Sequence, residues 1–401
     1  MNIAFISYEY PPETGGGGIG SYLIQCNTWF NKDGNIATII CGTAKETAFW
    51  ESDTVYRIPS KTWEEFDEKL PEYFLGLNKN FDIIEGIDFR GCGLSLKNIN
   101  LQTPIIARAH TLNYVVDHYL TDNLSIWQKI RFGLGALRRF TIPSFNRGLQ
   151  KIDYQREFDF LKEADAIVSP SKELIKTYVK LGIKNDFYHL PLLFSLNNIS
   201  VPYTLTPQNN RLKIVFFGRL EKRKGILNII EVIPHILKSN LNVHFYFVGA
   251  PALSPKSKLM MDDFIKFKLK KYKEYITVLP AIPYNQVKSL IQAGDIFLQP
   301  SLFDNFPVAC LEIMANGKCI IGSDSGGMAE MIENAKSGIL IKPDNTRDLI
   351  FAINQLLTDQ SLIKKYGSQA KQRANLFHPE KIVKQQIAIY QKVIDEFKLL
   401  K

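Results

Sequence analysis

Short apolar runs alternate along the chain with segments whose apolar residues recur at helical spacing. Residues 3–7 predict a buried strand, residues 19–30 an amphipathic helix, and residues 36–40 a second strand. Further strands are predicted at residues 81–85, 104–109, 165–169, 212–217, 243–248, 276–279, 295–299, 318–322 and 338–341. Strands that alternate with helices are typical of α/β domains, in which helices cover both faces of a parallel sheet.

A segment rich in proline, asparagine and serine, at about residues 195–210, interrupts this alternation, which restarts after it. We therefore expect two doubly wound domains, residues 1–195 and 210–378, and the length of 401 residues fits that number. Residues 379–401 predict an amphipathic helix that no strand follows, and we expect it to pack at the domain junction. Ligands of parallel sheets bind beyond the carboxyl ends of the strands, so motifs just after strands matter most.

Composition narrows the class of protein. With 45% hydrophobic and 22% charged residues, the chain can bury sizeable cores, which excludes wholesale disorder. No apolar run is long enough to span a bilayer, and the first residues lack the pattern of a signal peptide. The five cysteines lie far apart and show no metal-binding spacing, so we expect buried thiols in a cytoplasmic protein.

The net charge of +9 is unevenly distributed along the chain. Residues 1–200 hold 21 basic and 23 acidic residues, whereas residues 201–401 hold 28 and 17. A basic field favours anionic partners, namely phosphates, nucleic acid or an acidic membrane. A solvated surface that only confers solubility is an equally good explanation of the charge alone.

A run of four glycines, Gly15 to Gly18, follows the first predicted strand and precedes a helix. Glycines leave the helix N-terminus open, where free N–H groups and the helix dipole favour a phosphate. The run also fits the dinucleotide pattern G-x-G-x-x-G, but two preceding prolines lengthen the turn, and no acidic residue ends the second strand. A flexible loop without a ligand is the alternative.

Arg219 and Lys224 follow the first strand of the second half, in the segment G-R-L-E-K-R-K-G. Two cations at this position can hold a diphosphate through charge-assisted hydrogen bonds. Basic charge at a helix start opposes the dipole, which indicates a compensating anion. The alternative is a solvated helix start.

Two carboxylates, Asp304 and Glu312, lie after a later strand, and both are expected to face a ligand. The backbone N–H groups near Asn305, Phe306 and Val308 are expected to line the same site. Carboxylates accept hydrogens from the hydroxyl groups of a sugar or a ribose. Asp304 also fits a plain helix N-cap.

Together with the segment S-G-G-M-A-E at residues 325–330, these motifs resemble the family 4 glycosyltransferases, which have the GT-B fold. The resemblance covers nearly the whole chain in the right order and is strongest over residues 212–345. It implies two Rossmann-like domains that face one cleft, with a nucleotide-diphospho-sugar bound to the second and the acceptor to the first. It further implies transfer with retention of anomeric configuration, without a divalent metal or a cofactor.

The resemblance also implies roles for single residues. Arg219 and Lys224 hold the diphosphate and stabilise its charge during transfer, Glu312 binds the ribose, and Gly17 and Gly18 approach the donor.

Asp304 would orient the transferred sugar, with Asn305, Phe306 and Val308 at the donor. His110, at the end of a strand, matches a family histidine near the donor sugar; a packed or capping histidine is the alternative. The family more often has Glu at position 304 and Gly where this chain has Pro307, which leaves the identity of the donor sugar open.

Residues 123–151 interleave cations with bulky apolar side chains. This pattern fits a helix that rests on an anionic membrane surface, and it fits equally well a helix that covers the sheet. A membrane surface would make the protein peripheral on the inner face of the membrane and favour a lipid-linked acceptor.

The resemblance favours a glycosyltransferase that moves a sugar from a UDP- or GDP-sugar to a hydroxyl group of a glycan or lipid-linked acceptor, and nucleic acid is not expected as a partner. Three alternatives stay open: a sugar-nucleotide epimerase, a dinucleotide-dependent oxidoreductase, and a basic membrane- or nucleic-acid-binding protein without activity. The last alternative predicts binding that weakens with salt and survives loss of Asp304 and Glu312.

Overall fold

A computed structural model describes the chain at residues 1–15, 17–99, 101–110, 112–116, 151–196, 201–206 and 210–399. Its contacts divide into two compact units. The first comprises Met1–Ser169, Ile175–His189 and Gln386–Lys401, and the second Pro170–Leu174 and Leu190–Gln385. Two helices, α6 (Lys172–Lys180) and α14 (Pro379–Leu399), are each divided between the units, so the units do not coincide with the domain limits expected from the sequence.

The first unit contains an eight-stranded sheet of order β3-β4-β2-β1-β5-β6-β7-β8, in which only the β3–β4 pair is antiparallel. Its strands are β1 Asn2–Ile6, β2 Ile36–Thr43, β3 Phe49–Ser52, β4 Val55–Pro59, β5 Ile83–Ile87, β6 Ile105–Arg108, β7 Ala166–Ser169 and β8 Phe187–His189. Besides parts of α6 and α14, its helices are α1 Gly18–Lys32, α2 Trp63–Gly76, α5 Lys151–Glu163 and the short 3-10 segments η1 Phe89–Gly91 and η2 Leu94–Asn98.

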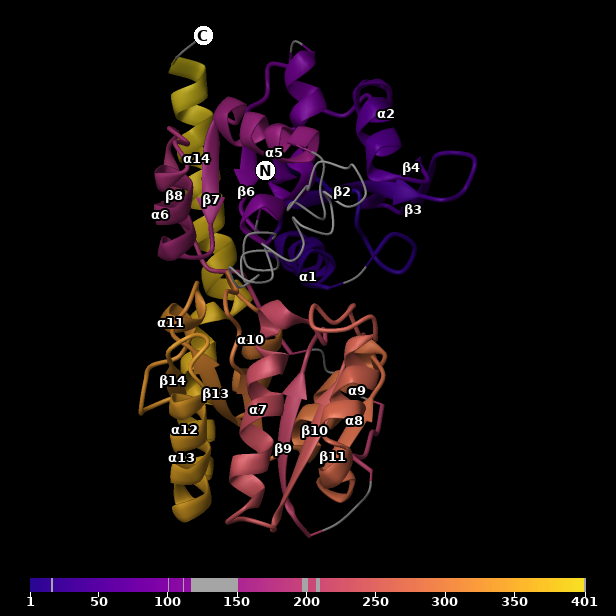
Figure 1. Ribbon diagram of the computed structural model, residues 1–401. Helices are drawn as coiled ribbons and strands as arrows, with labels where there is room; N and C mark the ends of the chain where they lie inside the picture. The colour runs from indigo at the N-terminus through magenta and orange to yellow at the C-terminus, as the bar shows by residue number, and fades with distance from the viewer. Residues whose placement is uncertain are drawn as a thin grey trace. The chain divides into compact units, whose positions relative to one another are not determined.

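The second unit contains a six-stranded, fully parallel sheet of order β11-β10-β9-β12-β13-β14 (Figure 1). Its strands are β9 Leu212–Phe217, β10 Val243–Val248, β11 Ile276–Leu279, β12 Ile296–Gln299, β13 Cys319–Ser323 and β14 Ile339–Ile341. Its α-helices are α7 Ile226–Leu237, α8 Met261–Lys268, α9 Tyr284–Ala293, α10 Val308–Ala315, α11 Met328–Met331, α12 Thr346–Thr358 and α13 Ser361–Ala374. Its 3-10 segments are η3 Lys222–Lys224, η4 Lys270–Tyr275 and η5 Asn375–Phe377.

The prediction of two doubly wound α/β sheets is confirmed, and each predicted strand is present with its ends shifted by at most a few residues. The sequence analysis missed β3, β4 and β8. β3 and β8 are short edge strands with few buried residues, and the five residues of β4 are interrupted by Arg57, so none of the three makes a long apolar run.

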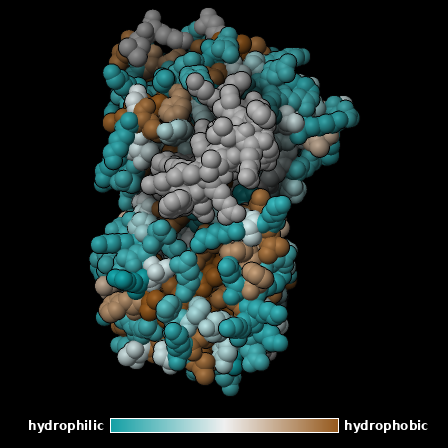
Figure 2. Space-filling model, viewed as in Figure 1, coloured by the Kyte–Doolittle hydropathy of each residue, from teal (hydrophilic) through white to brown (hydrophobic). Residues whose placement is uncertain are grey.

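Apolar side chains fill the space between the sheets and their helices, as the sequence pattern requires. In the second unit, one continuous core joins α7, α8 and α12 to the central strands through residues such as Ile214, Ile229 and Ile353. On the face shown in Figure 2, the described residues of this unit are mostly hydrophilic, with hydrophobic ones between them.

All five cysteines are buried and unpaired, as predicted. Among the described residues no helix is long and apolar enough to cross a membrane.

Candidate functional site

The sheet of the second unit has a topological switch between β9 and β12. From β9 the chain continues to β10 and β11 on one side, and it then returns to β12 on the other side of β9. Loops that follow the two strands at such a point diverge and open a crevice for a ligand. The two motifs that the sequence analysis singled out follow these two strands, at residues 218–225 and 304–312.

Lys224 and Asp304 join the two loops. The Lys224 ammonium forms an ion pair with the Asp304 carboxylate, and Arg223 Nη1 lies 3.7 Å from Asp304 Oδ1. Burial disfavours the charged form of Asp304, but the two cations outweigh that effect and lower its pKa. Asp304 is therefore an ionised carboxylate at neutral pH.

Arg219 is placed differently from Lys224. Its side chain is 69% exposed, and its Nε lies 3.7 Å from Glu221 Oε2. Glu221 forms a closer ion pair with Arg223, whose Nη2 donates to Glu221 Oε1 at 2.8 Å. The Arg219 guanidinium is thus free to meet an anionic ligand at the end of β9.

Glycines allow these loops to approach one another. Gly225 has φ of +77°, and a side-chain carbon there would lie 2.0 Å from the carbonyl oxygen of Pro300. A side-chain carbon on Gly326 would lie 2.0 Å from the carbonyl oxygen of Asp304. At both positions only glycine fits, so Gly225 and Gly326 allow the loops after β9, β12 and β13 to approach one another closely.

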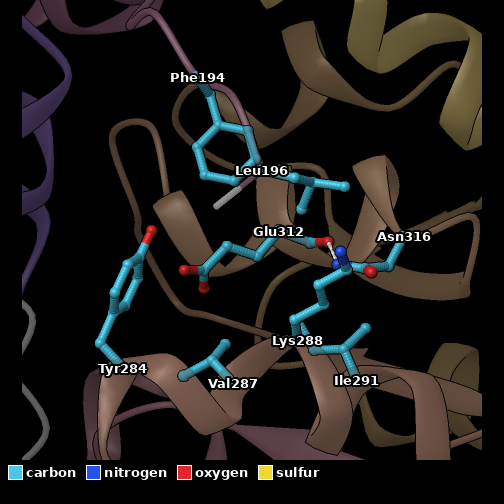
Figure 3. Close-up of a pocket in the computed structure, with 8 residues that line it drawn as sticks. All are labelled: Phe194, Leu196, Tyr284, Val287, Lys288, Ile291, Glu312 and Asn316. Carbon is cyan, nitrogen blue, oxygen red and sulfur yellow. Dashed lines mark hydrogen bonds between the residues drawn. The ribbon is translucent and has the colours of Figure 1, made fainter. Parts of the chain in front are cut away.

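Glu312 lies on α10 and lines a small pocket. The other lining residues are Phe194, Leu196, Tyr284, Val287, Lys288, Ile291 and Asn316. Figure 3 shows the Glu312 carboxylate pointing toward Tyr284, whereas Asn316 donates to the backbone carbonyl of Glu312 at 2.9 Å. The pocket therefore offers an acidic group within a mainly apolar wall.

Glu312 is a buried residue, and its carboxyl group makes no salt bridge within the described part of the chain. Burial raises its pKa from 4.5 to about 8. Burial also raises the pKa of Tyr284, assisted by the charge of Glu312, to about 12. At neutral pH the pocket thus presents a mostly protonated carboxyl group, which can both donate and accept hydrogen bonds.

Three further candidate residues lie between Asp304 and Glu312 in the sequence: Asn305, Phe306 and Val308. The Asn305 amide oxygen accepts from the Ser171 hydroxyl at 2.6 Å, and the Phe306 ring packs edge-on against Phe377, with centroids 5.5 Å apart. Val308 is the first residue of α10 and follows Pro307, whose side chain caps no N–H group. The N–H groups of Cys310 and Leu311 donate to the Pro307 carbonyl oxygen, at 3.0 and 3.4 Å, and those of Val308 and Ala309 have no partner within the helix.

Gly17 and Gly18 lie in the first unit, where Gly17 precedes α1 with φ of +102° and Gly18 is the first helical residue. A side-chain carbon on Gly17 would meet nothing within 4 Å, so its surroundings are open. The loop to which they belong follows β1, at the switch between β1 and β5.

A buried arginine, Arg57, holds the start of this loop. Its guanidinium donates to the carbonyl oxygens of Tyr10, at 3.0 Å, and Pro11, at 3.2 Å, and to that of Gly42, at 3.0 Å. Its Nε donates to Glu51 at 2.6 Å. The side chain is fully buried, so these contacts fix the path of the chain before the glycine run.

His110 also lies in the first unit, after β6. Its backbone N–H donates to Asp88 Oδ1 at 2.8 Å, and its ring meets the ring of Tyr22 edge-on, with centroids 5.2 Å apart. Burial, with the nearby charge of Arg108, lowers the pKa of His110 to about 3. Its imidazole is therefore neutral at pH 7.

Comparisons with known proteins agree with this arrangement. Residues 204–373, which carry both motifs of the second unit, match the family model described as glycosyl transferases group 1. Over this range the chain is similar to group 1 glycosyltransferases.

The relatives extend over the whole chain. Alpha-maltose-1-phosphate synthase of Mycolicibacterium smegmatis is 22% identical over 414 aligned positions, which cover 98% of this chain and 100% of that protein. The structure of sucrose-phosphate synthase from Thermosynechococcus elongatus superposes with a TM-score of 0.73 and 18% identity, over 98% of this chain and 99% of that one. The structure of Anabaena HepE in complex with UDP-glucose superposes with a TM-score of 0.66 and 16% identity. The superposition covers 98% of this chain and 99% of that one. The GT-B fold expected from the sequence is confirmed.

Several residues of the second unit escaped the sequence analysis. Arg223 was part of the basic run, but only the structure shows that it bridges Glu221 and Asp304. Tyr284 and Phe194 line the Glu312 pocket from distant segments, and no motif links them to it. Tyr284 follows β11 by a few residues, so its position after a strand is the one signal that the sequence offered.

Proposed function

We propose that the protein transfers a sugar from a UDP- or GDP-sugar to a hydroxyl group of a glycan or lipid-linked acceptor, with retention of anomeric configuration. The proposal needs neither a divalent metal nor a cofactor. The observation that carries it is the placement of Arg219, Lys224 and Glu312 at the two strands of the topological switch, inside the segment that matches the glycosyltransferase model.

Arg219 and Lys224 bind the diphosphate in this proposal. The exposed Arg219 guanidinium forms a bidentate contact with phosphate oxygens, and Lys224 adds a second cation next to the ionised Asp304. Asp304 accepts a hydroxyl hydrogen of the transferred sugar. The N–H groups near Asn305, Phe306 and Val308 face the negative charge of the diphosphate.

The chemical step balances without a side-chain base. The bond between the anomeric carbon and the donor's phosphate oxygen breaks, and its electron pair stays on that oxygen. The anomeric carbon bonds to the acceptor oxygen, whose proton passes to an oxygen of the departing diphosphate. Arg219 and Lys224 stabilise the charge that develops on the leaving group, which is the task of a metal ion in other transferases.

Glu312 binds the ribose in this proposal, beside Tyr284 and Phe194 in the pocket. The two ribose hydroxyl groups donate to the carboxylate, so the bound nucleotide favours its ionised form. Since burial raises the pKa of Glu312 to about 8, nucleotide binding at pH 7 releases a proton.

We also propose that Gly17, Gly18 and His110 contact the donor. The open surroundings of Gly17 leave room for a ligand, and the neutral imidazole of His110 is suited to a hydrogen bond with a sugar hydroxyl. We further propose a peripheral location on the cytoplasmic face of a membrane for the lipid-linked case. The segment on which this rests, residues 123–151, lies almost wholly outside the described residues.

The test uses the full chain with a panel of UDP- and GDP-sugars in buffer with EDTA. We expect one donor to release its nucleoside diphosphate slowly to water, with the freed sugar first appearing in the anomeric configuration of the donor by NMR. Release should be much slower in Arg219→Ala. Conversion of the sugar while it stays on the nucleotide would instead indicate an epimerase, and no reaction with any donor would overturn the proposal.

A further inference from the structure

The loop before α8 and the helix itself expose apolar side chains that globular proteins usually bury. Leu253 is 65% exposed, Met260 41% and Phe267 66%. The helix belongs to the second unit and lies beside β11 (Figure 1). Its residues Met261, Phe264 and Ile265 are part of the core. The exposed side chains are therefore not needed to hold the helix in place.

Backbone pairing brings two of these side chains, those of Leu253 and Met260, together. Leu253 and Met260 form an antiparallel bridge, flanked by the hydrogen bonds Ser254 N–H to Leu259 O, at 3.0 Å, and Met261 N–H to Ala252 O, at 2.8 Å. Directly opposite residues of this kind project to the same side of the ribbon. Phe267 lies on α8, which begins at Met261, directly after Met260; we call Leu253, Met260 and Phe267 the apolar row.

Lysines are frequent in the same segment of the chain. Residues 256–273 hold seven lysines and two acidic residues, Asp262 and Asp263, and both acidic residues pair with Lys266. Five of the lysines form no salt bridge within the part of the chain that the structure describes, and all five are exposed: Lys258, Lys268, Lys270, Lys271 and Lys273. We call residues 253–273 the α8 surface.

We propose that the α8 surface docks the protein on an anionic lipid bilayer. Leu253, Met260 and Phe267 enter the boundary between headgroups and acyl chains, and the lysines contact the lipid phosphates. Charge complementarity favours an anionic partner, and the apolar row selects a membrane over a nucleic acid, whose backbone offers nothing for three exposed apolar side chains. This site is separate in sequence from residues 123–151 and independent of the proposed sugar transfer.

The test measures co-sedimentation of the full chain with vesicles of phosphatidylcholine alone, or of equal parts phosphatidylcholine and phosphatidylglycerol. Each lysine near an anionic membrane contributes roughly fivefold to binding, so the triple variant Lys268→Gln, Lys270→Gln and Lys271→Gln should bind mixed vesicles roughly 100-fold more weakly. Phe267→Ser should weaken binding at low and at high salt, because its contribution is not electrostatic.

A matched control removes the same charge elsewhere in the second unit. Lys364, Lys365 and Lys371 on α13 are exposed, and their triple glutamine variant should bind vesicles nearly as well as the unchanged protein. Any binding through residues 123–151 persists equally in both triple variants.

Equal loss in the two triple variants, or none in the α8 variant, would overturn the proposal. Phe267→Ser that binds vesicles normally, together with tight binding of heparin that depends on the same lysines, would instead identify a site for soluble polyanions. Because all substituted side chains are exposed, each variant should melt at the temperature of the unchanged protein.

Discussion

The buried carboxyl group of Glu312 predicts how the stability of the protein varies with pH. In the folded state its pKa is about 8, whereas the ordinary value is 4.5. The folded state therefore holds the proton more tightly than the unfolded state does, so this group makes the protein less stable as pH rises from 4.5 through 8. Above that range the full cost is about 5 kcal/mol.

Glu312→Gln removes the charge and keeps the shape of the side chain. Between pH 5 and pH 9, the free energy of unfolding of the unchanged protein should fall by about 4 kcal/mol relative to that of the variant. Denaturant unfolding of both proteins at several pH values measures this difference, because other titrating groups contribute equally to the two. A difference that stays constant across the range would refute the buried, unpaired state of Glu312.

The same variant tests the role of Glu312 in binding. If the ribose hydroxyl groups bind the ionised carboxylate, a nucleoside diphosphate that binds at pH 7 should release nearly one proton more from the unchanged protein than from Glu312→Gln. Calorimetry in buffers of different ionisation enthalpy counts these protons. Equal proton release from the two proteins would contradict ribose binding at Glu312.

Three further substitutions test single contacts. Gly225→Ala should destabilise the protein by more than about 2 kcal/mol, since its side-chain carbon would meet the Pro300 carbonyl. The control Gly182→Ala, at a position with φ of +83° and open surroundings, should cost less stability. Equal losses of stability in denaturant unfolding would contradict the contact between position 225 and Pro300. Arg57→Met should lower the free energy of unfolding by about 3 to 5 kcal/mol, because the buried carbonyl groups and Glu51 lose their hydrogen-bond donor. A melting point within a degree or so of that of the unchanged protein would refute a stabilising role for Arg57. Lys224→Met should lower the melting temperature by leaving the buried Asp304 short of a cation; if its melting temperature is unchanged, the ion pair is not formed in solution.

The sequence predicted the architecture well because its signals are local. A parallel strand buried on both faces appears as a continuous apolar run, and β9, β10 and β11 begin and end where the pattern indicated. Edge strands such as β3, with the sequence FWES, bury little and show no such run. Their position depends on pairing with β4, which a local pattern does not contain.

In the candidate site, too, the sequence predicted what local signals carry and missed what depends on contacts between distant segments. Arg219, Lys224, Asp304 and Glu312 were identified because each follows a predicted strand. Their partners are separated from them by many residues: Lys224 and Asp304 are 80 positions apart, and their ion pair depends on the order of strands in the sheet. The environment of Glu312 was equally hidden, since its raised pKa results from burial by helices that the sequence does not bring together.

Nucleotide binding at Arg219 tests the central claim most directly. Isothermal titration of the full chain with UDP and with GDP, in buffer with EDTA, should show saturable binding of at least one of them. Because Arg219 is exposed and makes one long ion pair, Arg219→Ala should fold normally and bind that nucleotide roughly 10- to 100-fold more weakly, the loss of one charge-assisted contact. Absence of binding by both nucleotides, or equal affinity of the variant, would contradict a nucleotide-sugar site at this edge of the second sheet.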